Sequence, residues 1–179
     1  MKIYTQSKRF LLREIVEADA ADMFELDSDP EVHKYLGNKP VKNIAEVEQM
    51  IQFIRAQYEE NGIGRWAIID KLTNEFIGWS GLKLEKQLRK EFHYYDIGYR
   101  LKRKYWGQGI ATETAIESLR YGFEQLELEE ICAAAAIEHK ASNHILSKIG
   151  LTFSGTFDYE EEPHNWYILR KVDWLNLEE

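Results

Sequence analysis

The stretch that decides the fold covers residues 97–119 and reads IGYRLKRKYWGQGIATETAIESL. Its first residues alternate as in a β-strand, and apolar residues recur every three or four positions from Ile110 onward, which is typical of an amphipathic helix. Between the two lies a turn with Gly107 and Gly109, where missing side chains leave backbone N–H groups accessible to a ligand. The pattern predicts a strand, a glycine turn and a helix in direct succession.

The turn is also rich in positive charge, although the whole chain has a formal net charge of -8. A local surplus of this kind is typical of an anion site. The first turn of the following helix adds unpaired N–H groups and the positive end of a helix dipole, which together favour phosphate. The segment therefore predicts a polyphosphate site supported by four cations, Arg100, Lys102, Arg103 and Lys104.

Two common phosphate motifs fit this segment poorly. A Walker loop requires Lys and Ser or Thr after its last glycine, and GQGIAT has neither. A dinucleotide fingerprint requires GxGxxG directly after the strand, whereas here Thr112 stands at the third glycine and several residues separate the strand from Gly107. Glu129 and Glu130 do follow at the distance of a ribose-binding acid, so the dinucleotide interpretation stays open as the less favoured one.

Length and composition are those of one ordinary globular domain, spanning 1–179, with 44% hydrophobic and 30% charged residues. No apolar run approaches the roughly 20 residues that span a bilayer, and the first residues lack the apolar core of a signal peptide, so we expect a cytoplasmic protein that does not bind membranes. The single cysteine, Cys132, excludes an internal disulfide and a CxxC metal site. It lies in the apolar run ICAAAAI, where a core role is expected, and no metal site is predicted.

Net acidity argues against nucleic acid as a partner, because duplex binding requires a basic face. Acidity instead favours a cationic substrate.

Periodicity predicts an α+β protein with a mixed, mostly antiparallel sheet of about seven strands flanked by helices. The polar turn KLTNE predicts an antiparallel hairpin, and its glycines, Gly78 and Gly81, predict a bulge or a close backbone approach. The charged run 85–91 predicts a solvated tip. Expected strands cover 9–13, 66–70, 76–84, 92–101, 131–137, 151–159 and 166–172, and expected helices cover 19–26, 44–61, 110–126, 139–149 and a short segment from 30.

The segment KYWGQG resembles the acetyl-coenzyme A loop of the GNAT superfamily of N-acetyltransferases, with Lys104 where the family has Arg or Gln. Further matches follow in order and extend the resemblance from about residue 7 to 172. They are similar to the RimJ/RimL branch, the ribosomal-protein N-terminal acetyltransferases, and read SKRFLLREIVEADA, DPEVHKYL, WAIIDKLTNEFIGWSGL, YDIGYRLKRKYWGQGIATETA and HKASNHILSKIGLTFSGTF.

The resemblance implies acetyl-CoA as the donor and a sheet splayed between the strand ending near Leu101 and the strand 131–137, with pantetheine in the gap. It implies that His139, at the place of the family's usual asparagine, or the nearby Asn143 binds the pantetheine arm. Backbone groups of Tyr99, Arg100 and Leu101 would also meet pantetheine. The residues implied around the pyrophosphate are Lys104, Trp106, Gly107, Gln108, Gly109, Ala111 and Thr112.

The implied chemistry is direct attack of an amine on the thioester in a ternary complex. Asp96 aligns with a carboxylate that many relatives carry and is the candidate general base; the alternative is a solvated strand carboxylate. Leu146 stands where many GNAT enzymes have a tyrosine acid, so Ser142 is the candidate proton donor; the alternative is a helix cap or a contact with the cofactor sulfur.

The sequence offers no obvious strong general base, which favours an acceptor amine that loses its proton easily. Deprotonation at pH 7 costs about 1 kcal/mol for an α-amine and about 4.6 kcal/mol for a lysine. We therefore expect an N-terminal α-amine of a protein or peptide. The alternatives are a small amine, such as a polyamine, antibiotic or amino acid, and a non-catalytic acyl-CoA-binding module. The sequence is compatible with a monomer or a homodimer.

Overall fold

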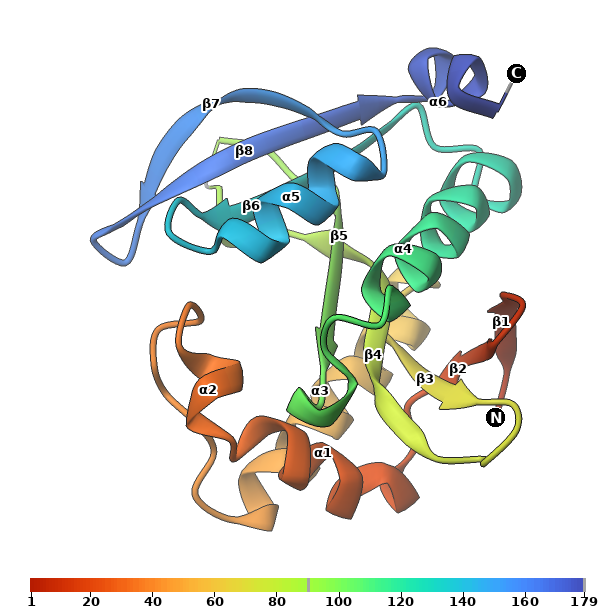
Figure 1. Cartoon of the computed structure of the whole chain (residues 1–179), viewed down its shortest axis with the longest axis vertical. Helices are drawn as coiled ribbons and strands as arrows, with labels where there is room; N and C mark the ends of the chain where they lie inside the picture. The colour runs from red at the N-terminus through yellow and green to blue at the C-terminus, as the bar shows by residue number, and fades with distance from the viewer. Residues whose placement is uncertain (90, 179) are drawn as a thin grey trace.

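The computed structural model describes residues 1–89 and 91–178, so Lys90 of the predicted tip and Glu179 lie outside it. Its frame is one eight-stranded sheet in the order β1-β2-β3-β4-β5-β6-β8-β7, in which β5 and β6 are parallel and the other neighbours are antiparallel (Figure 1). The expected α+β class and mixed sheet are confirmed. The strands are β1 Ile3–Gln6, β2 Phe10–Glu14, β3 Trp66–Asp70, β4 Phe76–Glu85, β5 Tyr94–Leu101, β6 Glu130–Ala136, β7 Thr152–Tyr159 and β8 Glu162–Arg170.

Six α-helices accompany the sheet within the described residues. Local chemistry sets their ends: the Asn43 side chain accepts from the Glu46 N–H at 3.2 Å before α3, and Gly62 ends α3 at φ 71°. The helices are α1 Ala20–Asp27, α2 Pro30–His33, α3 Ile44–Asn61, α4 Ile110–Arg120, α5 Lys140–Lys148 and α6 Lys171–Glu178. Two 3-10 helices are η1 Glu17–Asp19 and η2 Arg103–Tyr105, and a π-helical segment, η3 Tyr121–Gln125, directly follows α4.

Two elements escaped the sequence analysis. Strand β1 has only four residues, too few for alternation to stand out, and it raises the strand count above the expected seven. Among the residues of α6 whose burial is described, only Trp174 is buried, while Leu175 and Leu177 are exposed, so no periodic apolar stripe appears. Glu85, expected in a solvated tip, is buried and accepts from the N–H groups of Gln87 and Leu88.

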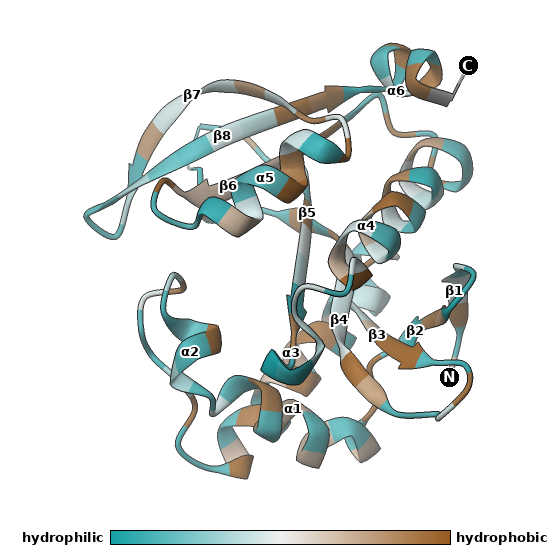
Figure 2. Ribbon diagram, viewed as in Figure 1, coloured by the Kyte–Doolittle hydropathy of each residue, from teal (hydrophilic) through white to brown (hydrophobic). Residues whose placement is uncertain are grey.

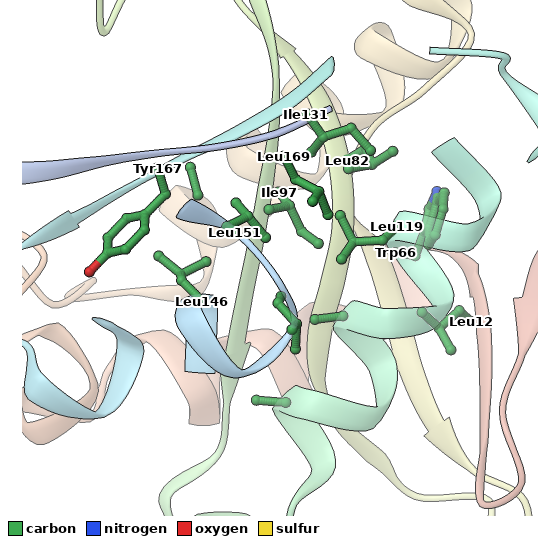
Figure 3. Packing of buried hydrophobic residues seen from close by; sticks show 14 of the residues in the cluster. Leu12, Trp66, Leu82, Ile97, Leu119, Ile131, Leu146, Leu151, Tyr167 and Leu169 are labelled. Carbon is green, nitrogen blue, oxygen red and sulfur yellow. The ribbon is translucent and has the colours of Figure 1, made fainter. Parts of the chain in front are cut away.

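Each face of the sheet carries its own core, and alternation along β3 divides the residues between them. Trp66 and Ile68 face α4 and α5, whereas Ala67 and Ile69 face α1 and α3. Figure 3 shows Leu119 of α4 and Leu146 of α5 in the first core, beside Ile97 of β5. Figure 2 shows hydrophobic colour along β3 and β4, while the turn between β7 and β8 is hydrophilic. The sheet is thus covered on both faces.

The sheet opens between β5 and β6. Their ladder contains one pair, Asp96 with Cys132, after which β5 continues to Leu101 without β6 beside it. Figure 1 shows the two strands diverging at this point. On its other edge β5 pairs with β4, and the two backbones approach so closely at Gly78 that a Cβ added there would lie 2.1 Å from the Arg100 carbonyl oxygen. The splay leaves a gap beside residues 97–101, and the close approach predicted for the strand glycines is confirmed.

No helix among residues 1–89 and 91–178 combines the length and apolar character needed to cross a bilayer.

Candidate active site

A cavity of about 1430 Å³ runs through the gap between β5 and β6. It is larger than the roughly 300–1,000 Å³ of a typical single-ligand pocket, which suits two substrates that meet. The sites implied by the resemblance are spread over more than 40 residues of sequence, and most converge here. Those that line the cavity are Asp96, Tyr99, Arg100, Leu101, Trp106, Gly107, Gly109, Ala111, Thr112, His139 and Ser142.

The glycine turn opens onto this cavity with free backbone donors. Gly107 and Gly109 adopt φ 72° and 74°, a left-handed conformation that strongly favours glycine. Among the described residues, no protein group accepts from the N–H groups of 107–112. Gly109 also precedes the first residue of α4, whose dipole favours negative charge there. The turn has the donor geometry of a pyrophosphate site.

A distant arginine fixes the shape of this turn. Arg9 donates through Nε to Glu113 at 2.7 Å and through Nη2 to the Gln108 carbonyl at 3.1 Å. Burial raises the pKa of Glu113, but hydrogen bonds from Ser7 and Arg9 outweigh it, so the net shift is downward. Arg9 offsets the carboxylate charge beside the proposed phosphate site. Sequence analysis missed this pair because its partners lie 104 positions apart.

Most of the predicted cation cluster does not face an anion site, which corrects the sequence interpretation. The Nζ of Lys102 is buried and donates to Asp22 at 2.7 Å and to Glu25 at 2.6 Å. The Nε of Arg103 lies 3.2 Å from the carboxylate of Asp29, the cap of α2. These cations attach the turn to α1 and α2, because their side chains follow the strand end toward the acidic helices.

Lys104 forms the longest ion pair of the four cations. Its Nζ lies 3.9 Å from Glu75, and both side chains are more than half exposed. An exposed pair of this kind is worth about 0–1 kcal/mol, so it opens readily for a ligand. Lys104 and Gln108 border the turn without lining the cavity.

Arg100 belongs to a buried network and does not present its backbone to the gap. Its Nη1 donates to Asp27, whose same oxygen lies 3.2 Å from His33 Nε2. Burial raises the pKa of Asp27, but the His33 hydrogen bond and the Arg100 charge lower it overall. The Lys102 N–H donates to Ile77, and alternation therefore directs the Arg100 backbone toward β4 as well.

By the same alternation the backbone groups of Tyr99 and Leu101 face the gap. The Leu101 carbonyl already accepts from Trp106 Nε1 at 2.9 Å. This bond holds the half-exposed indole across the start of the glycine turn. The free backbone groups at the gap are therefore those of Tyr99 and the Leu101 N–H.

The Tyr99 side chain crosses the gap to α5. Its hydroxyl donates to the Ser142 carbonyl at 3.2 Å and lies 3.1 Å from Ser142 Oγ. Burial raises the pKa of Tyr99, against a smaller lowering by Ser142, so the phenol stays protonated and able to donate. Leu146, one turn further along α5, points into the core (Figure 3). Sequence analysis gave Tyr99 only a backbone role.

Asn143 is not free to bind pantetheine, which corrects that alternative. Its side-chain N–H groups donate to the carbonyls of Ala136 and His139, each at 2.9 Å. Its oxygen accepts from Asn165 and Tyr167, each at 2.8 Å. Asn143 thus joins the β6–α5 turn to β8.

His139 remains at the cavity wall. Its ring stacks on Tyr35, with centroids 4.6 Å apart, and burial lowers its pKa, which favours the neutral imidazole. It can offer a hydrogen bond where the family has asparagine.

Asp96 lies on the opposite face of β5 from Tyr99, against the α1–α3 side. Arg65 holds it, donating through Nη2 to the carboxylate and through Nη1 to the Asp96 carbonyl at 2.7 Å. Arg65 reaches it across two paired glycines, Gly81 and Gly98, and a Cβ on Gly98 would lie 2.7 Å from Arg65 Nη2. Burial raises the pKa of Asp96, against the opposing charge of Arg65, which makes it a stronger base than an exposed carboxylate.

Other reactive groups do not form a second centre. Burial raises the pKa of Cys132, which keeps it a neutral thiol in the core. Among the described residues, no cluster of His, Cys, Asp and Glu has the arrangement of a metal site.

Comparisons with known proteins agree with this geometry. Residues 9–152 match the family described as acetyltransferase (GNAT) domain. The Bacillus subtilis protein named uncharacterized N-acetyltransferase YoaA is 33% identical over 150 residues, covering 84% of this chain and 83% of YoaA.

Solved structures show the same fold. A GNAT-family acetyltransferase from Bacillus anthracis aligns with TM-score 0.78 at 24% identity, covering 96% of this chain and 99% of the other. Spermidine N-acetyltransferase from Vibrio cholerae, in complex with CoA and spermine, aligns with TM-score 0.76 at 18% identity, covering 94% and 99%. The chain therefore belongs to the GNAT family of acetyltransferases, enzymes that take their acetyl group from acetyl-CoA.

Proposed function

We propose that this protein transfers the acetyl group of acetyl-CoA to the N-terminal α-amine of a peptide or protein. The amine nitrogen bonds to the thioester carbon, the carbon–sulfur bond breaks, the nitrogen loses one proton and coenzyme A leaves as a thiol. The observation that carries the proposal is a single cavity joining the free N–H groups of 107–112 to Asp96 on one side of the gap and Ser142 on the other.

Each end of the reaction has a candidate group. Asp96 accepts the proton from the attacking amine, and burial raises its pKa, which favours proton uptake compared with an exposed carboxylate. Ser142 donates to the departing sulfur, oriented by the Tyr99 hydroxyl 3.1 Å away. The N–H groups of Tyr99 and Leu101 at the gap are placed to stabilise charge on the thioester oxygen. Holding both substrates in one cavity supplies much of the rate.

The choice of an α-amine rests on deprotonation. Even with its pKa raised by burial, a carboxylate is a weaker base than a lysine amine, so Asp96 does not offset the several kcal/mol needed to deprotonate a lysine. Three consecutive glutamates, Glu160 to Glu162, line the mouth and attract a protonated acceptor. The fold shared with spermidine N-acetyltransferase keeps a small polyamine as the second candidate.

A thiol-release assay tests the proposal. Acetyl-CoA is supplied with a panel of free-N-terminus peptides, matched N-blocked peptides containing lysine, spermidine and an aminoglycoside. Turnover of the free-N-terminus peptides alone supports the proposal. Turnover of spermidine alone favours the small-amine enzyme, and acetyl-CoA binding without release from any amine would indicate a non-catalytic module.

A further inference from the structure

Helix α3 has one wide apolar face that extends from the core into the cavity. On this face, Val47 and Ile51 are fully buried in the core against α1. Met50, Phe53 and Ile54 recur at steps of three and four residues and line the cavity. Met50 and Ile54 are partly buried against the same core, whereas core packing does not account for the exposed Phe53.

Phe53 is the exposed member of this face inside the cavity. Phe53 is 62% exposed, and Leu36, from the segment after α2, lines the same cavity and is 42% exposed. Trp79 of β4 also lines the cavity and is partly buried. Large apolar side chains gathered in a concave surface mark a ligand contact, unlike single exposed residues elsewhere. We name Leu36, Met50, Phe53, Ile54 and Trp79 the apolar trough.

A polar group at the end of this face also lacks a partner. Gln57 follows Phe53 by one turn of α3 and lines the same cavity. Its side-chain oxygen is buried with no hydrogen-bond partner among the described residues. A buried acceptor without a donor is costly, so this oxygen calls for an N–H group from a ligand.

The surroundings of Trp79 disfavour an acceptor with several positive charges. The Arg65 and Arg100 guanidinium groups lie over the Trp79 ring, at 5.3 Å and 5.0 Å from its centroid. A second ammonium group on the acceptor would have to lose its water beside these cations and the apolar wall. A peptide instead offers backbone N–H groups for Gln57 and one uncharged side chain.

We propose that the apolar trough binds the side chain next to the attacking amine, so that the preferred acceptors are peptides beginning with Met, Leu or Phe. This inference rests on the proposed acetylation of α-amines and adds the identity of the first residue.

The test compares kcat/KM for peptides that differ only in a first residue of Met, Leu, Phe, Gly or Ser, with spermidine in parallel. We expect Met, Leu and Phe to exceed Gly by about tenfold or more, since each methylene in an apolar pocket is worth about 10- to 200-fold and this trough is open. Phe53→Ser should reduce that preference to about threefold or less, with little change for the Gly peptide.

Leu72→Ser is the matched control. Leu72 is 93% exposed in the β3–β4 turn and does not line the cavity, so the preference should stay unchanged. Equal kcat/KM for all first residues would leave α-amine acetylation standing and overturn the trough. Turnover of spermidine without any peptide would overturn both proposals. A preference that survives in Phe53→Ser would also overturn the trough.

Discussion

Gly107→Val tests the glycine turn most directly. Gly107 has φ 72°, and no atom lies within 4 Å of a Cβ built on it, so added atoms meet no protein group. The cost is backbone strain, about 1–2 kcal/mol for a non-glycine residue in this conformation and more for a β-branched one. The turn can escape the strain only by moving its N–H groups away from the ligand. We expect the acetyl-CoA dissociation constant to rise at least about tenfold, which corresponds to about 1.4 kcal/mol.

Gly62→Val supplies the matched control. Gly62 has φ 71° and equally open space, but it caps α3 and does not line the cavity. Urea unfolding should show similar losses of stability in both variants. Calorimetric titration with acetyl-CoA should separate them, with weaker binding only in Gly107→Val. Unchanged affinity in Gly107→Val, or equal loss in both, would refute the assignment of the turn.

Four further substitutions test the remaining assignments. Asp96→Asn should lower kcat by about 100-fold or more. Burial raises the pKa of Asp96, so wild-type activity should rise with pH as this carboxyl group loses its proton, and the pH–rate profile of the variant should lack this rise. Tyr99→Phe should lower kcat about five- to tenfold, the worth of one hydrogen bond of about 1 kcal/mol, with the KM for acetyl-CoA unchanged; Tyr167→Phe, which loses only its bond to Asn143, is the control in steady-state kinetics. Lys102→Met should leave acetyl-CoA affinity unchanged in the same calorimetric titration, and a clear loss would restore this lysine to the anion site. Asp27→Asn should destabilise the fold by about 3–5 kcal/mol at pH 7, because it leaves Arg100 uncompensated. The pKa of Asp27 is lower in the folded protein than its ordinary value of 3.8, so its stabilising contribution is present above pH 3.8 and is lost as the pH falls through the folded-state pKa. Urea titrations should therefore show the stabilities of the variant and the wild type converging in acid.

Elements with strong periodicity could be predicted from the sequence. Strand β3 was bounded correctly at Trp66–Asp70, and α3 was bounded correctly by its cap and Gly62. The glycine turn was located because its special residues are adjacent in sequence. Strand β1 and α6 were missed because burial in each depends on a few residues with no local pattern.

Contacts between distant segments could not be predicted. Arg65 reaches Asp96 because Gly81 and Gly98 happen to face each other across β4 and β5, and no spacing within one segment encodes that. Asn143 was mistaken for a ligand because its partners, Asn165 and Tyr167, lie more than 20 positions away. The type of each residue indicated which interactions its side chain can make, but the pairing of the strands determined which partner each side chain contacts.

The cation cluster shows why local charge did not identify how the turn holds an anion. Four positive side chains in five positions could neutralise a diphosphate, yet α1 supplies Asp22, Glu25 and Asp27, which hold two of them before any ligand arrives. A basic side chain can form an ion pair with any acidic neighbour. The directions of the N–H groups of 107–112, in contrast, are fixed by the φ angles of Gly107 and Gly109, near 70°, and by the start of α4. A site built on backbone donors keeps its geometry whatever the surrounding charges do. The acidic helices therefore anchor the strand end beside the gap, and we propose that the backbone N–H groups at the glycines, and not the cations, bind the phosphate.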